Sequence, residues 1–182
     1  VNQPHSIITA AALACIVLQS NQNEMFGGQS FPCWEYDLAP YVAKTFAKKF
    51  TDFICDQLED TGDDSWIRSQ MPLEKFDNIY NKHQTILSSE AKADIRRMLK
   101  GTDLYSKFHS DYFINKAFER ATFYTERDVA QAMKAVIHNL NTMQSRAGAQ
   151  VPFSCLNYGT GTKPEERMII KHLLLETEKG LG

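Results

Sequence analysis

The chain contains 182 residues, of which 43% are hydrophobic and 23% are charged. This length and composition are typical of a folded globular protein and exclude collagen-like and disordered chains. Lys and Arg total 20 against 22 Asp and Glu, so the formal net charge is −2 and no overall positive field favours polymeric nucleic acid. Any recognition of a phosphate group therefore has to be local.

The first predicted helix covers residues 6–23. It is apolar on nearly all sides and rich in alanine, which is typical of a helix buried against other helices. Its continuous apolar stretch, residues 7–18, is shorter than the roughly 20 residues that span a bilayer. We therefore expect no membrane contact, and the four scattered cysteines, which form no CxxC pair, are typical of reduced thiols in a cytoplasmic protein.

Two glycines at positions 27–28 interrupt this pattern. A turn over residues 32–40 is predicted to lead into a second helix over residues 39–58, whose apolar side chains recur at three- and four-residue steps. Paired glycines permit the close approach of a ligand phosphate or base, and Lys44 and Lys48 could supply positive charge. A tight turn between two packed helices explains the same glycines, and local sequence alone favours that structural explanation.

Helices are next predicted over residues 73–87 and 89–100, with Gly101 ending the second. The aromatic-rich stretch 102–123 is expected to mix helix and loop. A further helix is predicted to begin at Thr125, because an acidic residue follows three positions later and apolar residues then alternate at four- and three-residue steps. That apolar seam is predicted to be a packing face.

This last helix is expected to end at residues 146–148, and residues 151–158 are predicted to form a strand because they are bulky or β-branched. A glycine turn follows. Thr162 and Glu165 resemble a capping box, which predicts a final helix that continues to Lys179.

The turn over residues 159–162 is a candidate anion site, because free N–H groups at a helix N-terminus favour negative charge. Glycine turns of this kind also simply end strands, and that structural explanation is favoured on local grounds. Cys155 lies within the strand, where a nucleophile could face a pocket, yet no histidine or basic residue close in sequence would activate it. The five histidines are scattered and form no recognisable catalytic arrangement.

Two groups of sequence strings resemble the anaerobic, class III ribonucleoside-triphosphate reductases. One comprises FGGQS at residues 26–30 and YDLAPYV at residues 36–42. The other comprises SRAGAQVPFS at residues 145–154 and LNYGT at residues 156–160. The strings occur in the same order as in that family, and their combined length makes the resemblance specific.

The resemblance implies an enzyme that reduces ribonucleoside triphosphates to deoxyribonucleotides by glycyl and thiyl radical chemistry. It implies a homodimer, a deoxynucleoside triphosphate (dNTP) effector, structural zinc, and an activase that carries an iron–sulfur cluster and uses S-adenosylmethionine. The family's glycyl-radical motif, zinc-binding cysteines and thiyl cysteine are expected after Gly182, and another active-site cysteine and an ATP-binding regulatory region before Val1. The chain is thus expected to be an internal part of the reductase, with no catalytic residue, metal site or cofactor of its own, and Cys155 is not expected to be the radical cysteine.

The expected fold is mainly α with at least one β-strand, forming a fragment of the family's ten-stranded α/β barrel. Residues 1–60 are assigned to a helical pair at the dimer interface and effector region, residues 61–124 to a helical and loop insertion, and residues 125–182 to a helix–strand–helix unit of the barrel. By resemblance, the expected effector-binding residues are Gly27, Gly28, Gln29, Asp37, Lys44 and Lys48. The expected substrate-pocket residues are Arg146, Gln150, Ser154 and Asn157.

Two alternatives stay open on the sequence. One is a non-enzymatic helical module that binds nucleotides or forms dimers. The other is a different glycyl-radical enzyme, acting on a carboxylic acid or an alcohol.

Overall fold

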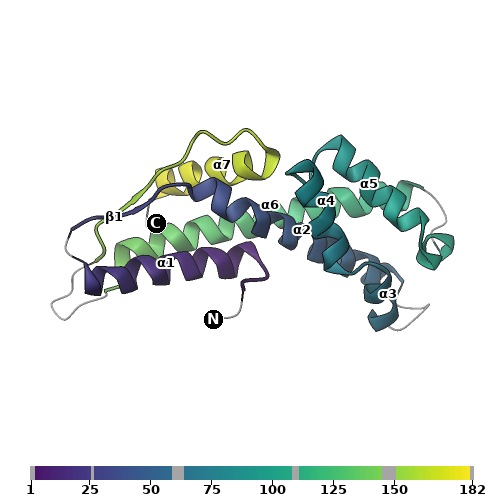
Figure 1. The fold of residues 1–182 in the computed structure, drawn as a ribbon, viewed down its shortest axis with the longest axis horizontal. Helices are drawn as coiled ribbons and strands as arrows, with labels where there is room; N and C mark the ends of the chain where they lie inside the picture. Colours follow the sequence, from purple (N-terminus) through teal and green to yellow (C-terminus); the bar gives the residue numbers. More distant parts are fainter. Residues whose placement is uncertain (1–2, 26, 59–63, 108–110, 145–150, 181–182) are drawn as a thin grey trace. The chain divides into compact units, whose positions relative to one another are not determined.

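A computed structural model describes the chain except for residues 1–2, 26, 59–63, 108–110, 145–150 and 181–182. The described residues are mainly helical and include a two-stranded parallel sheet, as Figure 1 shows. The expected mainly α chain with at least one strand is confirmed. In chain order the elements are α1 (Ile7–Glu24), β1 (Gln29–Phe31), α2 (Trp34–Gln57), α3 (Asp64–Gln70), α4 (Leu73–His83), α5 (Ser89–Lys100), the 3-10 helix η2 (Asp103–Lys107), α6 (Asp111–Thr142), β2 (Ser154–Leu156) and α7 (Pro164–Lys179).

The chain forms two compact units, each with its own hydrophobic core. Unit 1 consists of residues 1–42 and 127–182, and unit 2 consists of residues 43–126. The long helices α2 and α6 each contribute one end to unit 1 and the other to unit 2. The roles assigned from sequence to three successive segments stay predictions.

Helix α1 packs one side into the core of unit 1. Ala10 and Ala14 are buried, and such small side chains let neighbouring helices approach closely. Ile8, Ile16 and Val17 on its other side are 37%, 54% and 45% exposed. Among the described elements of unit 1, only the alanine-rich side of α1 is covered, and the burial of its other side between subunits stays a prediction.

Helix α2 begins at Trp34, five residues before the predicted start. The predicted turn over residues 32–40 is wrong beyond Cys33, because Pro40 lies inside the helix rather than before it. Proline has no N–H to donate to the carbonyl four residues earlier, which here belongs to Tyr36. Since Tyr36 is exposed, water can replace the missing bond at little cost.

Helix α6 is a single helix of 32 residues, and its predicted start at Thr125 is wrong. Thr125 is fully buried in the middle of the helix, so the sequence signal that resembles an N-cap is overridden by packing. For residues 102–123 the helical part of the expected mixture of helix and loop is confirmed, because this stretch holds η2 and the start of α6, and residues 108–110 between them lie outside the described residues. The predicted helix end at residues 146–148 is wrong, because α6 already ends at Thr142 and the described residues 143–144 are not helical.

The apolar seam near the end of α6 is confirmed as a packing face of unit 1. Its members Val129, Met133, Val136 and Leu140 are all buried, whereas Met143 at its end is 41% exposed. This seam shares a core with the buried side of α1 and with α7, and Figure 1 shows α1 running along this part of α6.

The strands β1 and β2 pair in parallel, with Gln29 opposite Ser154 and Phe31 opposite Leu156. Strand β2 lies within the predicted strand over residues 151–158 but covers only three of its residues, and β1 was not predicted. A three-residue strand is too short for an alternating pattern to stand out from turn sequence.

Helix α7 ends near Lys179 and Gly180 as predicted, but its start differs by one residue from the predicted capping box. The backbone N–H of Lys163 donates to the Glu166 carboxylate at 2.8 Å, so Glu166 closes this end instead of Glu165. Glu165 is instead fully buried.

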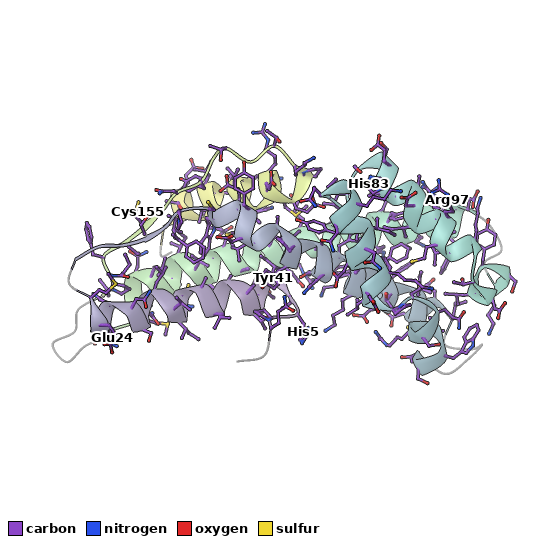
Figure 2. The ribbon with its side chains drawn as sticks, in the orientation of Figure 1. His5, Glu24, Tyr41, His83, Arg97 and Cys155 are labelled. Atoms are coloured by element: carbon purple, nitrogen blue, oxygen red, sulfur yellow. The ribbon has the colours of Figure 1, made fainter. Side chains whose placement is uncertain are left out.

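In unit 2, helix α4 stops at His83 rather than at the predicted residue 87, because Gln84 adopts a left-handed backbone with φ 56°. Helix α5 matches its prediction, and Gly101 caps it. Its Asp94 carboxylate is hydrogen-bonded to three side chains, which belong to His83, Lys82 and Arg97. The hydrogen bonds with His83 and Lys82 join α4 to α5 and, with the nearby charge of Arg97 on α5 itself, hold the pKa of Asp94 well below its usual range. Figure 2 labels His83 and Arg97.

An aromatic cluster fills the core of unit 2. Phe50 on α2 is fully buried, and its ring centroid lies 5.0 Å from that of Phe118 on α6 and 6.0 Å from that of Phe76 on α4. Aromatic pairs at these distances add to the free energy that burial alone provides. Phe50 thus joins three helices of this unit.

We predict that Phe50→Ala lowers the free energy of unfolding by about 3–5 kcal/mol, because it leaves a cavity that the surrounding helices cannot fill. The control is Phe123→Ala, which removes a side chain that is 64% exposed on the same unit. Urea unfolding followed by circular dichroism measures both. Equal losses for the two variants would contradict this account of the core.

Candidate functional site

The two sequence motifs that carry the family resemblance lie against each other in unit 1. The backbone N–H of Gln29 donates to the carbonyl of Phe153 at 2.8 Å, and that of Asn157 donates to the carbonyl of Phe31 at 2.9 Å. The N–H of Trp34 then donates to the carbonyl of Asn157 at 3.2 Å. Backbone pairing therefore continues past the short strands and into the start of α2.

The paired glycines serve this pairing directly. Gly27 has a φ of +104°, a backbone conformation that residues other than glycine rarely adopt. A Cβ on Gly28 would lie 2.9 Å from Cδ1 of Phe153, so any other residue here would force the exposed Phe153 side chain to shift. Backbone conformation at Gly27 and the close contact with Phe153 at Gly28 each favour glycine without a ligand, and the assignment of both residues to an effector site stays a prediction.

Glu35, in the first turn of α2, extends the pairing through its side chain. One carboxylate oxygen, Oε1, accepts from the backbone N–H groups of Gly159, Thr160 and Gly161 at 2.9, 3.1 and 3.0 Å. The residue is 1% exposed, and its other oxygen, Oε2, is buried without a hydrogen-bond partner among the described residues. Three donors that converge on one oxygen form a strong site for a negative charge.

The charge on Glu35 is stabilised by this arrangement. Burial alone would raise the pKa of Glu35, but hydrogen bonds from its own N–H and from those of residues 159–161 lower that pKa below the ordinary value for glutamate. The carboxylate is therefore ionised at neutral pH. The N–H groups that made this turn a candidate anion site are already occupied by an anion of the chain itself.

Gly161 permits the contact between the turn and Glu35. A Cβ at this position would lie 2.6 Å from Cβ of Glu166 and 2.9 Å from Cγ of Glu35. Real Cβ contacts are essentially never this short, so any other residue would force the turn away from α2.

The structure places the expected substrate residues only in part. Ser154 is half-buried on β2, directly opposite Gln29, and the side chain of Asn157 is exposed just beyond that strand. Arg146 and Gln150 lie outside the described residues. Residues expected in two different sites, Gln29 for the effector and Ser154 for the substrate, are thus partners in one sheet.

The expected effector residues are distributed over both units. Gly27, Gly28 and the buried Gln29 lie at or beside β1, and Asp37 is exposed in the first turns of α2. Lys44 and Lys48 follow on the same helix, half-buried and exposed respectively, but belong to unit 2. Their assignment to an effector site stays a prediction.

A pocket of about 270 Å³ lies between α1, β1 and the start of α2. Its walls are mostly apolar, and Asp37 and Tyr41 supply polar groups at its rim. Figure 2 labels Tyr41 on α2. An apolar floor with a carboxylate and an aromatic ring suits a flat, partly polar molecule such as a nucleobase. The pocket is lined by Pro4, Ala10, Leu13, Ala14, Val17, Phe31, Asp37, Leu38 and Tyr41.

Cys155 lies on β2, where its thiol is exposed and within 3.5 Å of Oδ1 of Asn157. Figure 2 labels its position. The hydrogen-bond partner given for this thiol is an amide oxygen, which is not a general base. This contact therefore supports no nucleophilic role for Cys155.

The sequence analysis missed Glu35, the residue with the most hydrogen bonds in this site. An acidic residue in the first turn of a helix is a recognised signal, because it complements the helix dipole. The signal was hidden because the helix was predicted to begin at residue 39, which put Glu35 in a turn.

Within the described ranges, no cluster of three or more His, Cys, Asp or Glu side chains could hold a metal ion. The helices of the same ranges include none that is long and apolar enough to cross a membrane.

Comparison with known proteins identifies the class. The model of the family described as anaerobic ribonucleoside-triphosphate reductase matches residues 1–182, the whole chain. The anaerobic ribonucleoside-triphosphate reductase of Enterobacteria phage T4 is 26% identical over 182 residues, which is 100% of this chain and 21% of the phage protein. The chain belongs to the family of anaerobic ribonucleoside-triphosphate reductases, and it spans about a fifth of the length of this relative.

We predict that Gly161→Ala destabilises unit 1 by about 1–3 kcal/mol, because the added methyl group collides with Glu35 and Glu166. Gly101→Ala is the matched control, since a Cβ there would meet its nearest atom at an ordinary 3.5 Å. Unfolding midpoints in urea compare the two variants. A Gly161→Ala protein as stable as Gly101→Ala would show that the turn is not tightly packed.

Proposed function

We propose that this chain is part of an enzyme that reduces ribonucleoside triphosphates to deoxyribonucleotides, and that it supplies substrate-binding and effector-binding groups. The observation that carries the proposal is the direct pairing of the two family motifs along β1 and β2. This pairing gathers Gln29, Ser154 and Asn157 around one small sheet. The two motifs are far apart in the sequence, and this pairing explains how both can contribute to one site.

In this proposal the substrate lies against the β2 side of the sheet. Asn157 offers an exposed amide, which can both donate to and accept from a sugar hydroxyl or a base. Ser154 offers a hydroxyl three residues earlier, on β2 itself. Arg146 and Gln150 are proposed to complete this pocket, with Arg146 supplying charge for a phosphate group.

The radical chemistry is assigned to other parts of the full enzyme. When present, the glycyl radical generates a thiyl radical that removes a hydrogen atom from the substrate ribose. In this proposal, residues of this chain bind and orient the substrate. None of the described residues is proposed to carry the radical or to bind the structural zinc or the activase's cluster. The strands β1 and β2 are proposed to be two neighbouring strands of the ten-stranded barrel, since they are parallel and connect through helices.

The pocket beside α1 is the proposed effector site for a dNTP. The Asp37 carboxylate can accept from an exocyclic amino group of a base, and the ring of Tyr41 can stack on the base. Gly27, Gly28 and Gln29 border the turn that leads into β1. Lys44 and Lys48 belong to unit 2, and they are proposed to bind effector phosphates on the family resemblance alone.

A homodimer is proposed through the exposed side of α1. Ile8, Ile16 and Val17 present apolar surface that no other described element of unit 1 covers. Apolar surface of this kind on a helix is favourably buried against another helix. The family resemblance names a second copy of the chain as the partner for this surface.

We predict that the full native protein containing this chain binds at least one of the four dNTPs, measured by calorimetric titration. Asp37→Asn should weaken that binding by about tenfold or more, because a hydrogen bond to a charged group contributes about 1.5–3 kcal/mol. Lys48→Glu should also weaken it, through repulsion of the phosphates.

The control is Asp56→Asn, which changes another exposed aspartate of α2. Saturable binding that Asp37→Asn weakens and Asp56→Asn leaves unchanged supports the effector site. Failure of the wild-type protein to bind any dNTP, or equal affinities for all variants, contradicts it.

A further inference from the structure

The Glu35 carboxylate does not reach the proposed substrate face itself. Its Oε1 is taken by three backbone N–H groups, and the residue is 1% exposed. Any effect that Glu35 has on a substrate must therefore pass through the turn over residues 159–161.

The turn is continuous with the backbone that carries Asn157. The N–H of Asn157 donates to Phe31, and its carbonyl accepts from Trp34, so both polar groups of its peptide backbone are used. The next bonds along the chain come from Gly159 and its two successors to Glu35. Residues 31–35 thus hold residues 157–161 from one end to the other, and Glu35 provides the last attachment.

Asn157 depends on this attachment because its side chain is not held by packing. The side chain is exposed, and the contact that it makes within the site is with the exposed thiol of Cys155 at 3.5 Å. The place of its amide is consequently set by the backbone on either side of it. Strand pairing holds one side, and the Glu35 carboxylate holds the other.

We infer that Glu35 is a positioning residue for ribonucleotide binding, which acts by holding the turn over residues 159–161 and thereby the side chain of Asn157. This inference rests on the proposed function. It also implies that the N–H groups of the turn do not bind the substrate phosphates, because Glu35 already occupies them. The triphosphate must be bound by other groups.

The chemistry of the site requires glutamate in particular. Aspartate is shorter by one methylene group and would not reach all three N–H groups without moving α2. Glutamine has the right length but no charge, and hydrogen bonds to a neutral acceptor are roughly half as strong as those to a carboxylate. Glu35→Gln therefore loosens the turn with the least change in shape.

The test uses the full native protein containing this chain, its activase, and the four ribonucleoside triphosphates. We expect Glu35→Gln to raise KM for ribonucleotide at least tenfold, since a misplacement of about 1 Å in a binding group can cost up to about 100-fold. We expect kcat to change by less than about twofold, because the radical chemistry lies elsewhere. Glu24→Gln, an exposed glutamate at the end of α1 that Figure 2 labels, is the control and should leave both constants unchanged.

Amide hydrogen exchange supplies a second measurement that does not depend on activity. In the ligand-free wild-type protein, the amides of residues 159–161 should be protected, and Glu35→Gln should increase their exchange at least tenfold. Saturating ribonucleoside triphosphate should leave the exchange of these three amides in the wild-type protein unchanged, because Glu35 and not the substrate holds them.

The possible results separate this inference from the proposed function. A wild-type protein that neither binds nor reduces any ribonucleoside triphosphate overturns the proposed function, and the inference with it. Ribonucleotide reduction whose KM is the same in the wild-type and Glu35→Gln proteins overturns the inference alone. A fall in kcat at unchanged KM, or unprotected amides at residues 159–161 in the wild-type protein, also overturns it.

Discussion

A buried carboxylate that accepts three successive backbone N–H groups holds the central part of unit 1 together. Glu35 lies at the start of α2, and the turn that it binds lies between β2 and α7. The interaction is strong because the acceptor is ionised and the Glu35 side chain is almost completely buried. It joins two segments that are more than a hundred residues apart in sequence, so neither segment can be placed without the other.

Much of the helical fold could be predicted because it depends on local patterns. The apolar run that forms α1, the capped α5 and the glycine stop after α7 all appear in the sequence. The starts of α2 and α6 could not be located, because tertiary packing overrides Pro40 and Thr125, which resemble signals for a helix boundary. Strand β1 was not predicted, because three residues are too few to show the alternation of polar and apolar side chains that indicates a strand.

The sequence identified segments that belong to the site, but it did not show how these segments contact one another. The glycines at positions 27–28 and the strand residue Ser154 were recognised through family resemblance, but their contact across the sheet depends on long-range pairing that no local pattern contains. Glu35 was missed because the predicted helix start at residue 39 placed it in a turn, and its contacts are also long-range. Its partners are backbone N–H groups, which are identical in every residue except proline, so only the folded chain shows that they converge on one oxygen.

The central claim is that Glu35 and the turn over residues 159–161 act as one structural unit. A double-mutant cycle tests it most directly, with free energies of unfolding measured for the wild-type protein, Glu35→Gln, Gly161→Ala and the double variant. Because Gly161→Ala already pushes the turn away from the carboxylate, the second substitution should cost about 1 kcal/mol less in its presence than alone. Effects that add to within about 0.5 kcal/mol would contradict the claim, since independent sites behave in that way.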